Sequence, residues 1–413
     1  MYNNFVEEAV RMYRELPYEN NELYKRYRLK FDLPGIDNSR SYTENVGRWS
    51  NIAESVSKDI RIRFDAVIYN GRYLHTSDST KTSISAIKTS DMPREMMEQK
   101  LFHSSDDKFA AYTHAYSKLS IEITGEGDAA ANILFITDSE SESLPIQLQI
   151  KGRTGSKILI NEFYVSSGNN QTVCGAMHEI IAHNGSHVEL TMLHIEGSNV
   201  NAFSLVKGEA HGSGIIKTNL ISAGGRMFRH RNDLVAKGKG STLETNDTII
   251  GFGSQSIDVG TNTRNAERAT NSNSTIRAIV LDRSSAFIKG FAKIEKGCSG
   301  SVSRINEHGL IGDKDAFLYL IPDMSIDESD VIATHSSASA PIDSEKVFYM
   351  QSRGIMDSTA QFLIMNGLIS ETISKITDNE MRMVSYSIAA DRVKSRSPGV
   401  SEAHNISELW LHK

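Results

Sequence analysis

Turn residues recur at short intervals through the middle of this chain. Glycines mark the turns at Gly185, Gly197, Gly212, Gly224, Gly240 and Gly253, so that successive turns lie little more than a dozen positions apart. The segments between them alternate apolar and polar residues, which is typical of short β-strands. No proline interrupts the chain between Pro145 and Pro322. The fold must therefore accommodate a long series of short strands, each ended by a turn.

Regular turns at this spacing suit either a β-sandwich or a solenoid of stacked coils. Two features favour a right-handed parallel β-helix. The repeat continues for more turns than a single sandwich needs, and the small turn residues let successive coils stack closely. Periodicity by itself leaves a pair of antiparallel sandwiches open. We expect a mainly β fold, a right-handed parallel β-helix flanked by N-terminal and C-terminal helical regions.

Changes in residue pattern along the sequence divide the chain into three regions. Residues 1–118 form a charged, largely helical region with a small β element, residues 119–340 form the β-helix, and residues 341–413 form a helical region. In the first region, Asn70-Gly71 between two β-rich runs predicts a hairpin. Ser105 or Asp106 is expected to cap the helix in "SDDKFAAYTHAYS".

Cap residues also predict helices after Pro341. Asp343 or Ser344 is expected to cap "EKVFYMQSR", Gly354 to end that helix, and Asp357 to cap the next one. The second helix has a broad apolar surface, which serves either internal packing or a partner. That surface contains Phe362, Leu363, Met365 and Leu368.

Composition excludes several classes of protein. A hydrophobic content of 39% and a charged content of 23% are those of an ordinary globular protein. The net charge of −6 argues against non-specific binding to nucleic acid or to an anionic membrane. The longest mainly apolar runs, such as "AAANILFI", are far shorter than the roughly 20 residues that span a bilayer. Because the N-terminus has no signal-peptide pattern, we expect a cytoplasmic protein.

Familiar catalytic motifs are absent or incomplete. In "HEIIAH", His178 and His183 are five residues apart, where one helical face needs four, and the surrounding sequence is strand-like. Four histidines of the β region are expected to be solvated or hydrogen-bonded: His183, His187, His194 and His211. "GKGST" at residues 238–242 lacks the spacing of a phosphate-binding loop. We find no nucleophile elbow and no dinucleotide fingerprint, so the chain is not expected to be an enzyme.

One long stretch resembles a known family. "GLIGDKDAFLYLIPDMSIDESDVIATHSSASAPIDSEKVFYMQSRGI" is similar to the C-terminal part of the SufB/SufD family of the SUF iron–sulfur cluster assembly system. It contains a Leu-Ile-Gly-Asp strand, a histidine among small residues, and an acidic cap before "VFYMQSRGI". "DAVIYNGRYLHTSD" and "IDVGTNTRNAERATNSNSTIRAIVLDRSSAFIKGFAKI" resemble earlier parts of the family. The resemblance extends from about Asp65 to Arg353.

The resemblance implies a scaffold rather than a catalyst. It implies a parallel β-helix that dimerises with a SufB-like chain or with itself, and C-terminal helices that dock a SufC-like ABC ATPase. His335 matches the histidine that the family places at the dimer interface as a ligand of the iron–sulfur cluster. The metal-ligand and cofactor-binding expectation therefore rests on His335, with Cys298 as a lesser candidate.

The chain also departs from the SufB pattern. Where SufB carries a cysteine proposed to receive sulfur, this chain has Asn306, and where SufB has a glutamate after the histidine, it has Ser336. Cys298 lies eight residues before Asn306 and approaches the site only if the register differs; otherwise Cys298 and Cys174 are buried, inert thiols. The pattern is closer to SufD, or to an early-branching SufB/SufD-like chain.

A second class of function remains open at this stage. Gly-Ser turns suit a carbohydrate-active or adhesive β-helix protein equally well. Such an enzyme should present clustered carboxylates on one face of successive coils, whereas the acidic residues of the β region are scattered along the sequence. The scaffold is the favoured interpretation.

Overall fold

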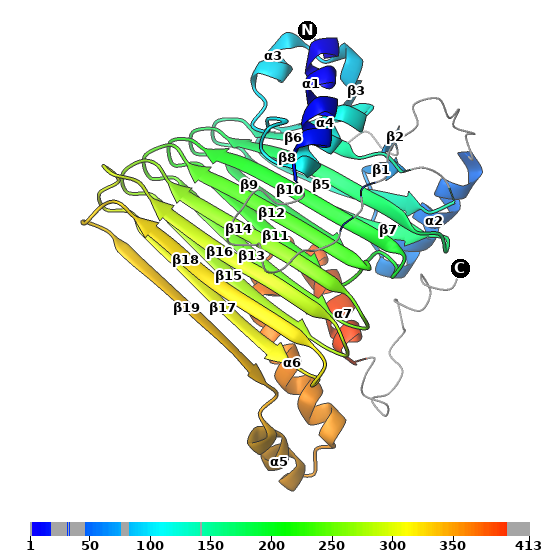
Figure 1. Ribbon diagram of the computed structural model, residues 1–413, viewed down its shortest axis with the longest axis vertical. Helices are drawn as coiled ribbons and strands as arrows, with labels where there is room; N and C mark the ends of the chain where they lie inside the picture. Colours follow the sequence, from blue (N-terminus) through cyan, green and yellow to red (C-terminus); the bar gives the residue numbers. More distant parts are fainter. Residues whose placement is uncertain are drawn as a thin grey trace.

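Two large sheets dominate the computed structural model, which describes residues 2–17, 31, 33, 46–75, 82–140 and 143–394. The fold is mainly β, with 48% strand and a β-solenoid of about 8 turns between N-terminal and C-terminal helices (Figure 1). The expected fold class is confirmed.

The ten-stranded sheet holds, in spatial order, β19 (Ile332–Pro341), β17 (Val302–Ile311), β15 (Asn271–Val280), β13 (Thr242–Gly251), β11 (Ile215–Ser222), β9 (His187–His194), β7 (Lys157–Ser167), β5 (Asp128–Asp138), β1 (Ala66–Tyr69) and β2 (Arg72–His75). The nine-stranded sheet holds β18 (Phe317–Ile326), β16 (Ser285–Ile294), β14 (Ser256–Asn265), β12 (Met227–Ala236), β10 (Val200–Ala210), β8 (Thr172–Ala182), β6 (Ile146–Gly152), β4 (Leu119–Gly125) and β3 (Thr82–Lys88).

Each coil contributes one strand to each sheet. Parallel pairs therefore join strands two apart in sequence, such as β12 with β14 and β14 with β16. Met227 lies opposite Ser256, and Ser256 in turn lies opposite Ser285, so these successive coils use the same length of chain. A turn ends each half-coil, which explains why the turns recur at about half the length of a coil.

Small turn residues allow the coils to stack. A Cβ atom on Gly238 would lie 1.9 Å from the amide nitrogen of Gly212 in the preceding coil. No side chain can be accommodated at that distance, so the backbone approach depends on glycine. The alternating apolar residues that face between the sheets form one continuous core, which includes Ile160, Leu190 and Leu243.

The Asn70-Gly71 hairpin is confirmed. β1 and β2 pair antiparallel, with Tyr69 opposite Arg72, and the two turn residues have φ values of 48° and 79°. These positive values suit Asn-Gly. β1 also pairs in parallel with β5, so the first region contributes strands to the same sheets as the later coils. The region boundaries at 118/119 and 340/341 stay predictions.

The N-terminal helices are α1 (Tyr2–Glu15), α2 (Val46–Ile60), α3 (Arg94–Glu98) and α4 (Lys108–Tyr116), with a 3₁₀ turn at Thr89–Asp91. The predicted cap of α4 is wrong by one or two residues. Asp107 caps the helix, because its extended backbone lets its carboxylate accept a hydrogen bond from the Ala110 amide. Asp106 instead accepts the His103 amide.

The C-terminal helices are α5 (Ser344–Ser352), α6 (Asp357–Ile373) and α7 (Asn379–Lys394). Asp343 caps α5 by accepting the amides of Glu345 and Lys346, and Gly354, with φ of 84°, follows its last turn, as expected. The predicted cap of α6 is wrong. Met356 occupies the cap position, and Asp357, already inside the helix, accepts side-chain hydrogen bonds from glutamines instead.

The α6 and α7 helices pack on the outer face of the ten-stranded sheet. Met365 and Leu368 of α6 join a core cluster with Ile250 and Ile279 of that sheet. Leu363 remains 44% exposed. Most of the apolar surface of α6 therefore serves internal packing, and only part of it is open to a partner.

Candidate functional site

The last coil of the solenoid is uncovered. β18 and β19 are the terminal strands of their sheets, and no strand in the described part of the chain pairs with their free edges. Large apolar side chains project from this coil and are between 37% and 55% exposed: Phe317, Tyr319, Ile321, Ile326 and Ile332. An unpaired edge with exposed apolar side chains is typical of a surface that pairs with another chain.

His335 lies in the middle of this last coil. Its backbone is opposite Ile305 of β17, and its side chain is exposed. Ile305 faces the inside of the solenoid, because a Cβ atom on Gly290 of the opposite sheet would lie 2.9 Å from it. Since paired residues of neighbouring parallel strands share a face, His335 belongs to the inner face at the open end.

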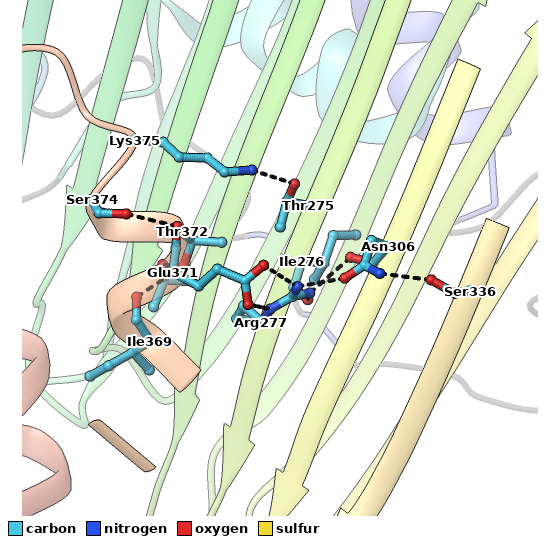
Figure 2. Close-up of polar contacts among 11 residues, drawn as sticks. Thr275, Ile276, Arg277, Asn306, Ser336, Ile369, Glu371, Thr372, Ser374 and Lys375 are labelled. Atoms are coloured by element: carbon cyan, nitrogen blue, oxygen red, sulfur yellow. Dashed lines mark hydrogen bonds and ion pairs between the residues drawn. The ribbon is translucent and has the colours of Figure 1, made fainter. Parts of the chain in front are cut away.

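Asn306 and Ser336 lie on the other face of the sheet. They are paired in register, and the Asn306 side-chain amide donates to the Ser336 hydroxyl at 2.7 Å. Figure 2 shows this contact continuing through Arg277 to Glu371 of α6. The two positions at which the chain departs from SufB are therefore brought together, but on the face opposite His335.

Arg277 anchors α6 near this site. Its side chain is 5% exposed, and its guanidinium group binds the Glu371 carboxylate and donates to the Asn306 carbonyl at 3.1 Å. Nearby, the Lys375 ammonium group donates to the Thr275 hydroxyl at 2.7 Å. These contacts place α6 on β15, two strands away from β19 (Figure 2).

Neither cysteine approaches His335. Cys298 lies in the turn before β17, and the part of that strand between Val302 and Ile305, the residue opposite His335, alone spans about 10 Å. It is buried, and its thiol donates to the Asn265 carbonyl at 3.3 Å. Burial, with help from Glu295, raises the pKa of the Cys298 thiol. Burial, with help from Glu196, raises the pKa of the Cys174 thiol to about 12.

His335 would be an incomplete metal site by itself. Among the residues that the structure describes, no group of three or more histidine, cysteine or acidic side chains is arranged to hold a metal ion. Of the histidines expected to be solvated or hydrogen-bonded, His194 is hydrogen-bonded. His194 is buried and contacts Glu196 at 2.8 Å, and His178 contacts Glu162 at 2.9 Å. "HEIIAH" lies in and just after strand β8.

Sequence reasoning missed the buried acids inside the solenoid. Asp247 and Glu307 are at most 1% exposed, on inner positions of β13 and β17. Burial raises the pKa of Asp247 to about 7. An acid at an inward position of a strand was the available signal, but it becomes readable only when the register of the coils is known.

Further large apolar side chains are exposed on the C-terminal helices, and we call this set of six residues the helical patch. Its six members come from α5, α6, α7 and the α5–α6 connection: Phe348, Tyr349, Met356, Leu363, Met383 and Tyr386. Phe348 is 71% exposed and Met383 is 68% exposed. The α5 helix extends beyond the strands at the lower end of the molecule (Figure 1).

Fold and site together define a parallel β-solenoid protein with an open last coil and helices docked on one sheet. Residues 135–368 match the family described as SUF system FeS cluster assembly, SufBD core domain. This match covers more than half of the chain, and the protein belongs to the SufB/SufD family. No helix in the described residues is long and apolar enough to cross a membrane.

Relatives of established name agree with the family match. The chain is 22% identical over 349 residues to the SufD iron–sulfur cluster assembly protein of Escherichia coli, covering 81% of this chain and 79% of the relative. It is 22% identical over 265 residues to SufD of Bacillus subtilis, covering 63% and 60%. A SufBD family protein of Staphylococcus epidermidis is 25% identical over 196 residues, covering 47% and 42%.

Proposed function

We propose that this chain is a non-enzymatic, cytoplasmic scaffold subunit of a SUF iron–sulfur cluster assembly complex. The uncovered last coil is the observation that carries the proposal. A solenoid end with exposed apolar side chains is stabilised when a second subunit covers it. The partner is a SufB-like chain or a second copy of this chain, and the iron–sulfur cluster is the cargo held transiently at that interface.

His335 supplies one ligand to this cargo. A neutral imidazole binds iron well, and the exposed side chain at the solenoid end is accessible to a partner. Because the described residues offer no complete ligand set, the remaining ligands come from the partner chain.

The helical patch docks a SufC-like ABC ATPase. Aromatic and methionine side chains are enriched at protein interfaces, and Phe348, Tyr349 and Met383 are far more exposed than core packing would leave them. The "GKGST" sequence lies in the turn between β12 and β13, without a following helix to bind phosphate. The partner ATPase therefore supplies nucleotide hydrolysis.

Carboxylates on the outer face do not favour the carbohydrate-active alternative. Asp258 is engaged by Arg229 at 3.1 Å and by Arg231 at 2.7 Å, and Asp323 lies 3.4 Å from Lys289. A glycosidase needs two carboxylates free to act on a substrate. Acids already paired with buried cations suit a structural role.

Two variants separate the two proposed interfaces. Tyr319→Asp on β18 should abolish dimerisation and leave capture of the ATPase unchanged. Phe348→Asp on α5 should abolish capture of the ATPase and leave dimerisation unchanged. Light scattering measures the dimer, and co-purification with the SufC-like ATPase measures capture. A chain ending near Ala340 should lose capture of the ATPase, and retention of the ATPase by that chain would refute the docking assignment. A protein that stays monomeric at micromolar concentration, with and without a SufB-like partner, would refute the dimer assignment.

A further inference from the structure

Two like charges lie side by side on the nine-stranded sheet. Arg264 of β14 pairs directly with Lys293 of β16. Neighbouring strands lie about 4.8 Å apart, and paired residues of parallel strands share a face. Like charges at opposed positions destabilise a sheet. The pair therefore costs free energy that an anion bound between the two cations would offset.

The other strand pairs follow the opposite pattern. Where two Asp, Glu, Lys or Arg residues pair elsewhere in the described sheets, their charges have opposite signs. Glu179, Lys207 and Asp233 alternate in this way across β8, β10 and β12. Arg264 and Lys293 break the pattern, so the stacking of the coils does not by itself explain them.

A cavity opens beside these two cations. It has a volume of about 1010 Å³, and Arg264 and Lys293 both line it. Lys289 and Phe291 of β16 line the same cavity, with the Lys289 ammonium group 5.7 Å from the centre of the Phe291 ring. Sites for small ligands commonly have volumes of roughly 300–1,000 Å³. The cavity therefore has room for a small organic molecule beside three cations and an aromatic ring.

Other cations of the cavity are held by acids of the chain itself. Asp258 is 4% exposed and binds both Arg229 and Arg231. Lys207 binds Asp106 at 2.6 Å. A ligand gains little from cations that are already paired with buried or closely bound acids. The part of the cavity formed by β14 and β16 is therefore the better place for an anion.

The acids near the three cations of β14 and β16 are more exposed. They come from β18 and from the turns after β16 and β18: Glu295 lies 2.9 Å from Arg264, Asp327 lies 4.0 Å from Lys293, and Asp323 lies 3.4 Å from Lys289. Their side chains are between 32% and 53% exposed. Exposed ion pairs contribute little to stability, because water screens them. A bound anion can therefore replace these carboxylates as the counter-charge.

We propose that Arg264, Lys289 and Lys293 bind the phosphate group of a small ligand whose aromatic part packs on Phe291. A guanidinium group binds two phosphate oxygens at once, and lysine adds compact positive charges. The aromatic ring of such a ligand gains from stacking on a second ring. The inference does not depend on the proposed function, because these residues lie on the nine-stranded sheet, whereas His335 lies on the ten-stranded sheet.

Calorimetry of the full-length chain at low salt tests the site with phenyl phosphate, inorganic phosphate and a hexaglutamate peptide. Phenyl phosphate should bind at least about threefold more tightly than inorganic phosphate, because only its ring packs on Phe291. Phe291→Leu should remove this difference. Added salt should weaken the binding of both phosphates.

Arg264→Gln and Lys293→Gln should each weaken the binding of phenyl phosphate by at least about fivefold. Arg264→Lys, which keeps the charge but loses the planar fork, should bind with intermediate affinity. Arg153→Gln is the matched control, because Arg153 is also an exposed arginine paired with a glutamate, Glu126, and lies outside the cavity. It should bind phenyl phosphate as the wild type does.

Lys293→Glu separates ligand binding from stability. It places opposite charges at the paired positions, so the ligand-free variant should melt at a higher temperature than the wild type. The same variant should lose the binding of phenyl phosphate. An unchanged or lower melting temperature would show that the two paired cations carry no cost, which would remove the basis of the inference.

Four results of the titrations would also overturn the inference. They are no saturable binding of phenyl phosphate by the wild type, wild-type binding by Arg264→Gln and Lys293→Gln, equal weakening by Arg153→Gln, and tighter binding of hexaglutamate than of phenyl phosphate. The last result would identify an acidic protein segment as the ligand. Thermal melting shows whether each variant is folded, and Arg264→Lys tests the site if a glutamine variant is not.

Discussion

Arg277 on β15 and Glu371 on α6 form a two-pronged ion pair, with Nε 2.8 Å from Oε2 and Nη2 2.6 Å from Oε1. Arg277 is buried, while the Glu371 side chain is half-exposed. The same guanidinium group reaches Asn306 on β17, so one side chain connects a C-terminal helix to the strand that precedes the last coil. Parallel contacts of this kind between arginine and carboxylate fix geometry as well as charge.

Glu371→Gln should lower the free energy of unfolding by about 1–3 kcal/mol, because it leaves the buried Arg277 without its anion. Hydrogen exchange should also rise along α6. Asp327→Asn is the matched control, since Asp327 lies 4.0 Å from Lys293 in a more exposed pair and should contribute about 0–1 kcal/mol. An equal loss in both variants would show that Arg277 holds nothing beyond a surface ion pair.

The same pair has a defined dependence on pH. Arg277 holds the pKa of Glu371 below its usual 4.5. A lowered pKa in the folded state gives stability that is present above pH 4.5 and is lost as pH falls through the folded value. The stability difference between wild type and Glu371→Gln should therefore shrink below pH 4.5, as denaturant titrations at pH 3.5 and 6 would show.

The contribution of Asp247 to stability should have the opposite dependence on pH. Its carboxyl accepts the Thr261 hydroxyl at 2.6 Å, but burial raises its pKa from 3.8 to about 7. Between these values the unfolded chain releases the proton and the folded chain keeps it, so stability falls as pH rises to about 7 and then stays level. The full loss is on the order of 4 kcal/mol. Asp247→Asn should remove it, and urea midpoints at pH 5 and 8 should diverge between variant and wild type; a constant difference would contradict the burial effect.

Gly238→Ala should be strongly destabilising. Its new Cβ atom would lie 1.9 Å from the Gly212 nitrogen, and backbone must move to make room. We expect the free energy of unfolding to fall by more than about 2 kcal/mol, and a glycine variant in α6 is the control. Gly367→Ala, at a helical site with no atom within 4 Å of the added carbon, should be neutral or stabilising by up to about 1 kcal/mol. Thermal denaturation of both variants measures the contrast.

Cys298 should be dispensable for cluster loading. Its thiol is buried and hydrogen-bonded to Asn265, and burial raises its pKa. It should therefore react slowly with a thiol reagent until the chain unfolds. Cys298→Ala should assemble a complex with the wild-type amount of iron and acid-labile sulfide. Rapid labelling of the folded protein, or a loss of iron from this variant, would restore Cys298 as a functional thiol.

His335→Ala should leave folding nearly intact but reduce cluster loading. An exposed imidazole at the solenoid end contributes little packing, whereas truncation of a core side chain typically costs roughly 2–5 kcal/mol. Iron and acid-labile sulfide bound per assembled complex provide the measurement. Equal loading of variant and wild type would show that the histidine is not a ligand.

Local chemistry allowed the sequence to determine the repeating elements of this protein. Glycine turns at short, regular intervals indicated a series of short strands, and Asn70-Gly71 indicated a hairpin because both residues tolerate positive φ. Asp343 was readable as a cap for a similar reason, since a cap acts within its own turn. The cap of α6 was not, because Asp357 is a good capping residue that the structure places one position inside the helix.

Only the tertiary structure decided which side chains meet. A strand alternates faces with every residue, and a shift of one position reverses every side chain, so the inner or outer placement of His335 and Ser336 depends on pairing with β17. Glu307 and His335 are separated by nearly a full coil of chain and become neighbours only when one coil closes on the next. In the sequence, Cys298 is only eight residues from Asn306, but the structure places Cys298 in a buried turn. Strand register, rather than sequence separation, sets the distance between side chains in a solenoid.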